Sequence, residues 1–308
     1  MDIELLTNIL YATIRTGTPL ILVALGEMVC EKSGVLNLGQ EGMMLMGAVV
    51  GFMAAITTGN LYVAVLVSIF AGMFMASLFG FLSISLVSNQ VATGLALTIF
   101  GGGLSAFLGA SYVGVGIDGI QPLNIPMLSD IPIIGKILFQ QDPLVYLSFA
   151  LFALVYWVFK STRLGLNIRA VGENPEAANA TGINVHAVRY LCVIFGGAMA
   201  GLAGGYLSLA YTPLWSEGMT AGKGWIALSL VVFASWKAER IMLGAYLFGA
   251  ASIMHLILQG TRFEIAPNLL AMLPYVATIF VLVLLSSNHA KTKLNTPMSL
   301  GMPYRPQL

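Results

Sequence analysis

Long apolar runs separated by short polar connectors make up most of the chain. Five runs contain no Asp, Glu, Lys or Arg: 42–117, 143–159, 190–216, 241–261 and 265–290. A helix needs about 20 apolar residues to cross the hydrocarbon core of a membrane, and within lipid every backbone N–H must find its acceptor inside its own helix. The runs therefore predict roughly eight to ten membrane-spanning helices.

This pattern predicts an all-α, polytopic membrane helix bundle that forms a single transmembrane domain over residues 1–308. Residues 3–14 are expected to form a short amphipathic or interfacial helix. Spanning helices are expected at 18–30, 42–58, 61–87, 91–111, 144–159, 188–211, 225–236, 241–259 and 267–286. The longer connectors are 112–143, 160–187 and 212–224, and residues 287–308 are expected to form a cytoplasmic tail.

Composition agrees with this interpretation and excludes a soluble protein. Charged residues make up 9% of the chain, against about 25% in an average soluble protein. Apolar residues make up 58%, and the mean hydropathy is +0.88. The net charge of +1 gives no field that would attract nucleic acid, so we expect membrane lipid and not nucleic acid around this chain.

The positions of Lys and Arg predict the orientation of the helices. Connector 160–187 is rich in Lys and Arg, whereas connector 112–143 carries one Lys against three Asp. Because cytoplasmic loops carry an excess of Lys and Arg, we place 160–187 inside and 112–143 outside. The same threading places the N-terminus outside and puts four further segments inside: 31–41, 88–90, 237–240 and 287–308.

Small residues recur at four-residue spacing in several of the expected helices. Packing drives helix association in lipid, and small residues let two backbones approach closely. We therefore expect three ridges to be helix contacts: Gly47 with Gly51, Gly72 with Ala76 and Gly80, and Gly197 with Gly201 and Gly205.

Two segments match cofactor-binding motifs in part, but the residues and elements around them exclude that function. Gly101–Ala106 fits a dinucleotide-binding pattern, but no strand precedes it. Gly222-Lys223 ends like a phosphate-binding loop, but Gly224 stands where Ser or Thr would hold magnesium. The three His residues are scattered along the chain. The sequence predicts no catalytic residue, no metal site and no cofactor bound by this chain.

Connector 160–187 is the longest segment rich in charged and polar residues before the tail. Asn174-Pro175-Glu176 is typical of a helix start, because Pro suits the first turn and Glu suits the positive helix end; Gly182 is a natural C-terminal cap. A short helix with small side chains can fit a groove on a cytoplasmic partner, and the alternative is a solvated loop. The candidate docking residues are Glu173, Asn174, Pro175, Glu176, Ala177, Ala178, Ala180 and Gly182.

Between Glu27 and Gly42 one helix ends and another begins, with glycines and polar side chains at the break. Broken helices at membrane depth are tolerated beside a cavity or inside protein. The segment is therefore either part of a transport path or a turn at the membrane face. Residues Gln40–Met43 resemble Ser216–Met219. An inverted repeat would explain this similarity, but a match of four residues also arises by chance.

Three motifs resemble those of the permease subunits of bacterial ABC importers: Gly34–Ala48, Ala170–Asn184 and Glu217–Gly224. The resemblance covers about residues 15–285. It is to the branched-chain amino acid and ribose permease superfamily, within which the 34–48 motif favours the nucleoside-uptake branch. That branch pairs a shorter permease with a longer one, and we expect this chain to be the shorter, because the sequence shows no further N-terminal span. The resemblance implies a multi-pass protein of the bacterial plasma (inner) membrane.

The same resemblance implies a mechanism and a set of partners. An extracytoplasmic substrate-binding lipoprotein would deliver the substrate, and a second homologous permease would complete the path as a heterodimer. A separate ABC ATPase subunit would bind ATP-Mg and drive the cycle. This chain would then be a transport subunit and not an enzyme, with Glu173–Gly182 as its coupling helix.

The path itself is expected to be neutral, because Glu27 and Glu41 alone among the acids come near the membrane interior and both lie toward its inner face. A neutral polar lining with aromatic side chains suits a nucleoside, whose base stacks on aromatics and hydrogen-bonds to amides; a sugar or a branched-chain amino acid is the alternative. The candidate path residues are Asn37, Gln40, Glu41, Asn89, Gln90, Thr93, Phe100 and Trp225.

An ion-coupled secondary transporter is the alternative from another class. It would need membrane-buried carboxylates or an ion site between broken helices. It would also leave connector 160–187 without a role.

Overall fold

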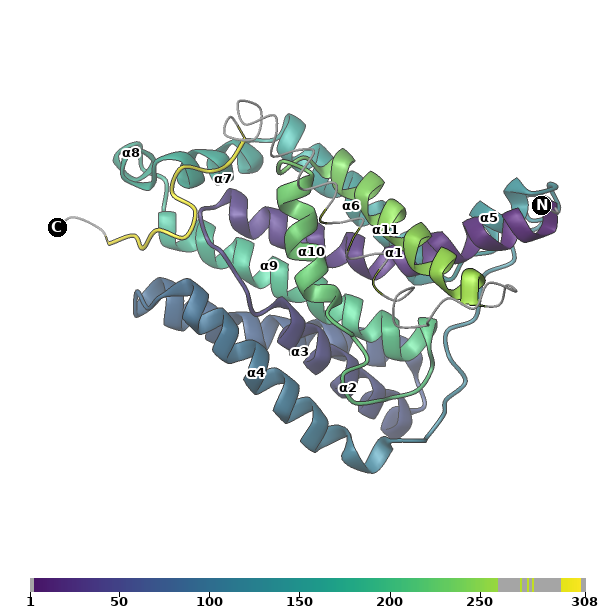
Figure 1. Ribbon diagram of the computed structural model, residues 1–308. Coiled ribbons are helices and arrows are strands. Elements are labelled where there is room, and N and C mark those ends of the chain that lie inside the picture. The colour runs from purple at the N-terminus through teal and green to yellow at the C-terminus, as the bar shows by residue number, and fades with distance from the viewer. Residues whose placement is uncertain (1–2, 260–271, 273–275, 277–278, 280–294, 306–308) are drawn as a thin grey trace.

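The computed structural model describes residues 3–259, 272, 276, 279 and 295–305. Over these residues the chain is an all-α bundle, as the hydropathy pattern predicts (Figure 1). The expected helix 267–286 lies outside the described residues. Within them, six spans are long and apolar enough to cross a membrane: Ile3–Lys32, Gln40–Thr58, Leu61–Ser85, Gln90–Tyr112, Pro143–Ser161 and Val185–Tyr211.

These spans are built from six α-helices and three short extensions. The helices are α1 (Ile3–Lys32), α2 (Gln40–Thr58), α3 (Leu61–Gly80), α4 (Gln90–Gly109), α6 (Pro143–Ser161) and α9 (Val185–Tyr206). The extensions are π-helical turns after α3 and α9 (η1, Phe81–Ser85; η3, Leu207–Tyr211) and a 3₁₀ turn after α4 (η2, Ala110–Tyr112). The remaining helices are α5 (Ile134–Phe139), α7 (Arg163–Glu173), α8 (Pro175–Ala180), α10 (Lys223–Phe233) and α11 (Ala238–Gln259).

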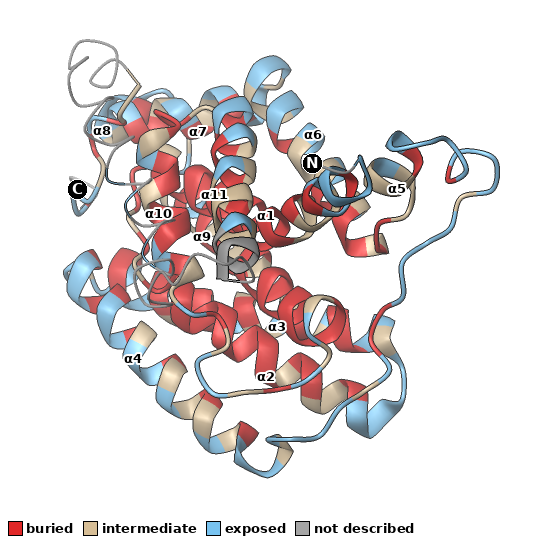
Figure 2. Cartoon of the chain, turned by 45° about the vertical axis from the view of Figure 1, so that its right-hand side comes forward, coloured by how far each residue is buried: buried red, intermediate tan, exposed pale blue. Residues whose placement is uncertain are grey.

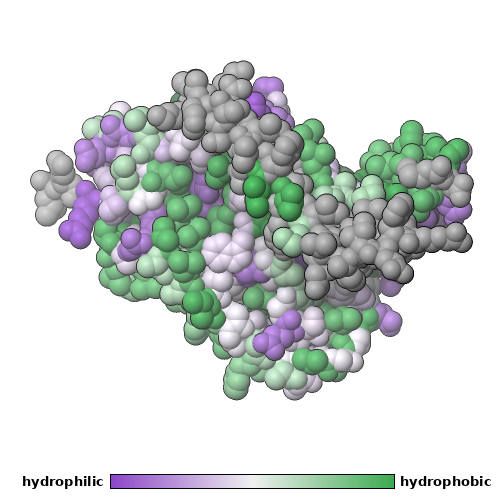
Figure 3. All heavy atoms as spheres, in the orientation of Figure 1, coloured by the Kyte–Doolittle hydropathy of each residue, from purple (hydrophilic) through white to green (hydrophobic). Residues whose placement is uncertain are grey.

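Helices α1, α2 and α9 form the centre of the bundle. Within the apolar 18-residue stretch of each span, 67% to 78% of the residues are buried in α1, α2 and α9, against 22% in α4 and α6. Figure 2 shows the buried positions concentrated on the central helices and the exposed ones on α4 and α6. Large apolar side chains such as Phe107 and Trp157 are exposed on those outer helices, and apolar residues cover much of the face seen in Figure 3. An apolar exterior of this kind suits a lipid surrounding.

Small residues let α9 contact α2 and α3 through their backbones. A Cβ atom added to Gly72 of α3 would lie 2.7 Å from the Cα of Gly201 in α9. A Cβ added to Gly47 of α2 would lie 2.6 Å from the same Cα. Gly197 in turn faces Gly72 and Ala76. The small-residue ridges are therefore helix contacts, as predicted.

One continuous helix, α1, replaces the two that were expected at 3–14 and 18–30. Pro19 lies inside it and has no N–H to donate to the carbonyl of Arg15. The hydroxyl of Tyr206 in α9 donates to that carbonyl instead, at 3.1 Å. Because a neighbouring helix supplies the missing hydrogen bond, α1 continues through Pro19.

The connectors collect at two ends of the bundle in the grouping that the charge pattern predicts. At one end Lys32 Nζ donates to the backbone oxygen of Asn295 in the tail, at 2.9 Å. At the other end Arg15 Nε lies 3.6 Å from the Asp142 carboxylate, directly before α6. Which end faces the cytoplasm stays a prediction of the positive-inside rule.

Two connectors and one expected spanning helix differ from their prediction. Both α7 and α8 lie in 160–187, where one short helix was expected; Thr162 caps α7 by accepting from the N–H of Gly165. Helix α5 lies in 112–143. Helix α10, expected at 225–236 as a spanning helix, has 11 residues. Its length of about 16 Å crosses roughly half of a 30 Å hydrocarbon core.

The backbone contact at Gly201 can be tested by adding a single methyl group. Gly201→Ala forces its Cβ into Ser68 and Gly72, and overpacking of this kind costs about 1–3 kcal/mol. We expect a lower melting temperature for the detergent-solubilised protein. Gly103→Ala in α4 is the matched control, because no atom lies within 4 Å of its added Cβ. Equal melting temperatures for the two variants would contradict the close packing of α9.

Candidate functional site

Helix α2 begins inside the bundle, and Glu27 of α1 holds its start. The chain leaves the helical path over residues 33–39. The Glu27 carboxylate accepts hydrogen bonds from the backbone N–H of Asn37 at 2.9 Å and from Gln40 Nε2 at 2.5 Å. All three side chains are fully buried. The break between α1 and α2 is therefore enclosed by protein and is not a turn exposed at the membrane face.

Helix α4 holds the same break from the other side. Gln90 Oε1 accepts from the N–H of Leu36 at 2.8 Å, and the Thr98 hydroxyl donates to the carbonyl of Leu38 at 2.9 Å. Gly94 allows the approach, because a Cβ there would lie 2.7 Å from the backbone nitrogen of Leu38. Buried backbone groups need partners, and the polar side chains of α1 and α4 supply them here.

The carboxylate of Glu41, in the first turn of α2, links this break to a second one, which lies between η3 and α10. Its Oε1 accepts from the Thr220 hydroxyl at 2.6 Å and from the N–H of Gly222 at 2.8 Å, and its Oε2 accepts from the N–H of Gly224 at 2.6 Å. These donors stand at the start of α10, so the carboxylate satisfies helix-terminal N–H groups and lies at the positive end of that helix.

Glycine is required at position 224 for this contact. A Cβ on Gly224 would lie 2.6 Å from the backbone nitrogen of Glu41 and 2.7 Å from its Cα. Gly222 has a φ of +77°, a backbone conformation that other residues adopt at a cost. The two glycines therefore bring the start of α10 against the start of α2.

The contact lies well inside the bundle. At the other end of α10, Trp236 Nε1 donates to Glu31 Oε2 of α1 at 2.5 Å, close to the end that carries Lys32. Glu41 is separated from that end by the 11 residues of α10, which is about 16 Å. Connector 212–224 therefore dips into the bundle to reach Glu41.

The candidate path residues separate into different environments. Asn37, Gln40 and Gln90 belong to the hydrogen bonds that fix the break, and Glu41 belongs to the contact with α10. The other four candidates lie at the surface or serve local contacts: Asn89 is exposed and caps α4, Thr93 is hydrogen-bonded to Ser88, and Phe100 and Trp225 are exposed. The structure does not bring the eight residues together in one site.

Three residues of the Glu41 contact were not among the candidates: Thr220, Gly222 and Gly224. The available signal was the polar, glycine-containing segment Glu217–Gly224 itself. The short similarity between Gln40–Met43 and Ser216–Met219 relates the segment to Glu41, about 180 residues earlier, but it does not predict a contact between them.

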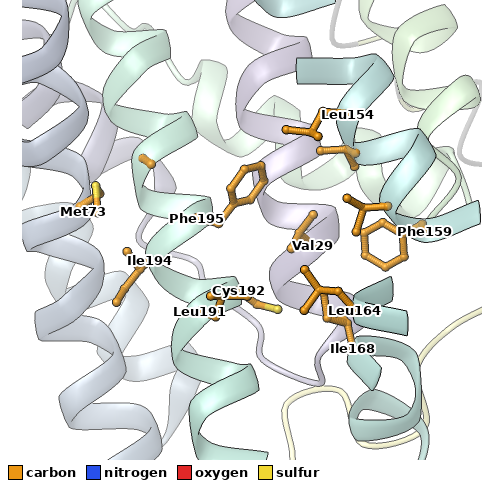
Figure 4. A pocket seen from close by; sticks show the side chains of 13 residues that line it. Val29, Met73, Leu154, Phe159, Leu164, Ile168, Leu191, Cys192, Ile194 and Phe195 are labelled. Carbon is orange, nitrogen blue, oxygen red and sulfur yellow. The ribbon is translucent and has the colours of Figure 1, made fainter. Parts of the chain in front are cut away.

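An apolar groove of about 500 Å³ lies between α1, α3, α6, α7 and α9 (Figure 4). Leu154, Phe159, Leu164, Leu191 and Phe195 are among the side chains that line it. Sites for polar small molecules combine an apolar wall with a few hydrogen-bonding groups, and this lining offers almost none. The groove is therefore not a site for a nucleoside or a sugar.

Helix α8 has the start and the end that the sequence predicts. The Asn174 side chain accepts from the N–H of Ala177 at 3.0 Å, Pro175 occupies the first turn, and Gly182 follows the helix with a φ of +88°. Ala177 and Ala180 are exposed, and so are Glu173 at the end of α7 and Glu176 in α8.

Ala178 does not belong to the exposed face of α8. Its side chain is 4% exposed and packs with Val171, Val185 and Tyr304. A docking partner therefore cannot touch Ala178, and Ala177 and Ala180 are the small side chains that α8 presents.

Comparison with known proteins gives the family. Residues 9–284 match the family described as the permease component of branched-chain amino acid transport systems. The chain belongs to this family. It is an ABC transporter permease, a multi-pass membrane subunit of a transport system and not an enzyme.

Three relatives cover most of this permease. A putative glucose ABC transporter permease protein, TsgC13 of Haloferax volcanii, is 39% identical over 98% of both chains. The nucleoside ABC transporter permease protein NupC of Lactococcus lactis is 33% identical over 87% of this chain and 89% of its own. The guanosine ABC transporter permease protein NupQ of Bacillus subtilis is 32% identical over 99% of this chain and 98% of its own. No solved structure matches this chain.

The Glu41 contact can be tested in the permease by removing its charge. Glu41→Gln replaces an accepting oxygen with an NH₂ group that opposes a backbone or hydroxyl donor, and a buried unsatisfied donor costs about 1–3 kcal/mol. We expect a lower melting temperature and a loss of transport by the assembled complex. Glu217→Gln is the matched control, because Glu217 is exposed on the same connector. If both variants melt and transport like the unmodified permease, Glu41 does not join the two breaks.

Proposed function

We propose that this permease is the shorter of two membrane subunits in an ATP-driven importer of nucleosides. The observation that carries the proposal is that the buried carboxylates of Glu27 and Glu41 already accept hydrogen bonds from the protein. The carboxylates of Glu27 and Glu41 accept hydrogen bonds from Asn37, Gln40 and the start of α10, so neither is free to pair with a charged ligand or a coupling ion. An uncharged ligand is what such an interior can transport.

The relatives support nucleosides and also give a second candidate. NupC and NupQ carry nucleoside and guanosine in their names, whereas TsgC13 carries glucose. Both ligand classes are neutral and rich in hydroxyl groups. A nucleoside adds an aromatic base that stacks on side chains such as Trp225, which follows Gly224 at the start of α10. This favours the nucleoside as the first candidate and a sugar as the second.

The exposed surfaces of this chain indicate which other subunits the importer would contain. Phe100 and Trp225 are exposed, so they line a path only if a second homologous permease closes over them. The exposed face of α8 would dock in a groove of an ABC ATPase that binds ATP-Mg. A substrate-binding lipoprotein would deliver the ligand at the end that carries connector 112–143.

The ATPase motion would reach the path through short contacts. Helix α8 leads directly into α9, whose Arg189 Nε donates to the carbonyl of Ser33 at 3.2 Å. Ser33 begins the break that Glu27 and Gln90 hold. A displacement of α8 is thereby passed to the start of α2 and, through Glu41, to α10.

Uptake by the reconstituted complex tests the substrate. Proteoliposomes with both permeases, the ATPase and the lipoprotein should accumulate radiolabelled guanosine or uridine when ATP is supplied, and a proton or sodium ionophore should not reduce uptake. Unlabelled nucleosides should compete for uptake and glucose should not. Competition by glucose alone would replace the nucleoside with a sugar, and uptake by this chain alone on an ion gradient would overturn the ABC mechanism.

A charge on α8 tests the coupling helix. Ala177→Arg puts an unpaired charge into the proposed interface, which costs about 2–5 kcal/mol and weakens ATPase binding roughly thirtyfold or more. We expect normal amounts in the membrane, little ATPase on copurification, and no transport. Ala110→Arg, at the opposite end of α4 from the cytoplasmic connectors, is the control and should keep ATPase copurification. Ala178→Arg is unsuitable, because it would also disrupt the packing around Tyr304.

A further inference from the structure

The tail segment 295–305 lies against the end of the bundle that carries α8 (Figure 1, yellow). Ser299 contacts the end of α7, because its N–H and hydroxyl both donate to the carbonyl of Gly172, at 2.9 and 2.7 Å. The N–H of Gly301 donates to the carbonyl of Gly34 at 3.1 Å. The tail is therefore bound at the same time to the coupling connector and to the break between α1 and α2.

Arg189 and Tyr304 fix the last part of the segment. The guanidinium of Arg189 is buried; its Nη1 donates to the carbonyl of Met302 at 3.4 Å, and its centre lies 5.8 Å from the centre of the Tyr304 ring. Tyr304 packs with Ala178 of α8 and with Val185 at the start of α9. Because the tail and α8 share this small core, they present their outer sides as one surface.

Two large apolar side chains stand on the outer side of the tail. Met298 is 76% exposed and Met302 is 58% exposed. Both line a pocket of about 260 Å³ that has polar and apolar walls and includes Glu173, the last residue of α7, and Glu176 of α8. Methionine side chains adapt to the shape of a partner and are frequent at protein-binding surfaces.

We propose that Met298 and Met302, together with the exposed face of α8, form one docking surface for the ATPase subunit. The inference rests on the proposed function, since it extends the interface of α8 to the neighbouring tail. A protein partner fits this surface better than a lipid headgroup does, because the two carboxylates of the pocket, Glu173 and Glu176, outnumber its one cation, Arg305, and give it a net negative charge that disfavours an anionic membrane surface. The tail thus places apolar contacts beside the small alanines of α8.

Substitution of both methionines tests the surface. Met298→Glu with Met302→Glu should leave the amount of permease in the membrane unchanged and reduce copurification of the ATPase roughly tenfold or more, with a parallel loss of transport. Met298→Leu with Met302→Leu should keep binding, because it keeps the apolar surface. Met127→Glu, at an 87% exposed Met in connector 112–143, is the control and should bind the ATPase normally.

Labelling of a single cysteine gives an independent measurement. Met302→Cys should react with an impermeant maleimide in inverted vesicles stripped of ATPase, whereas the two native cysteines are buried. Added ATPase should protect the new thiol. Labelling that the ATPase does not change, or a thiol already shielded by lipid before the ATPase is added, would overturn the proposal.

Loss of the tail surface and loss of the α8 interface give different results in these variants. If Ala177→Arg loses the ATPase while the double Glu variant binds it normally, the coupling role of α8 stands and the tail surface is wrong. If both variants bind the ATPase normally, the proposed function of α8 fails as well. Loss in both variants, with the Leu and Met127→Glu controls intact, supports a single docking surface.

Discussion

A single buried carboxylate, that of Glu41, connects the two discontinuities of this membrane bundle. Within lipid, a helix that starts part-way across leaves backbone N–H groups without acceptors, and each would cost several kcal/mol. Glu41 satisfies the N–H groups of Gly222 and Gly224 and the hydroxyl of Thr220. Without this acceptor α10 could not begin where it does. The polar break before α2, held by Glu27 and Gln90, is the other half of the same arrangement.

The packing around this polar core leaves little freedom. At the contact of α2, α3 and α9 the backbones meet at Gly47, Gly72 and Gly201, so these helices cannot slide without a clash. The end of the bundle against which the tail lies is held differently, by hydrogen bonds from Arg189 and Ser299 to backbone carbonyls. Contacts of this kind can exchange partners. A push on α8 would therefore be expressed as movement of the break and of α10 while the glycine-packed helices stay together.

The sequence predicts local features of the fold well and long-range contacts poorly. Hydropathy predicts six of the spans, and Asn174 and Gly182 mark the ends of α8, because each depends on residues nearby in the chain. The merging of 3–14 with 18–30 depends on a hydroxyl from Tyr206, and the pairing of Glu41 with Gly224 joins residues about 180 positions apart. Phe100 and Ala178 show the same limit, since residue type does not reveal which side of a helix is covered. The candidate site was therefore predicted in its polar residue types but not in its geometry.

The hydrogen bond from Tyr206 to the carbonyl of Arg15 has a consequence for how the protein is made. The two residues are 191 positions apart, so α1 leaves the ribosome long before its partner has been synthesised. Until α9 arrives, the carbonyl that Pro19 leaves free must be met by water or by the insertion machinery, because lipid offers no donor. The first half of the chain is thus an unfinished membrane structure during synthesis, and the late entry of α9 completes the insertion of the earliest helix.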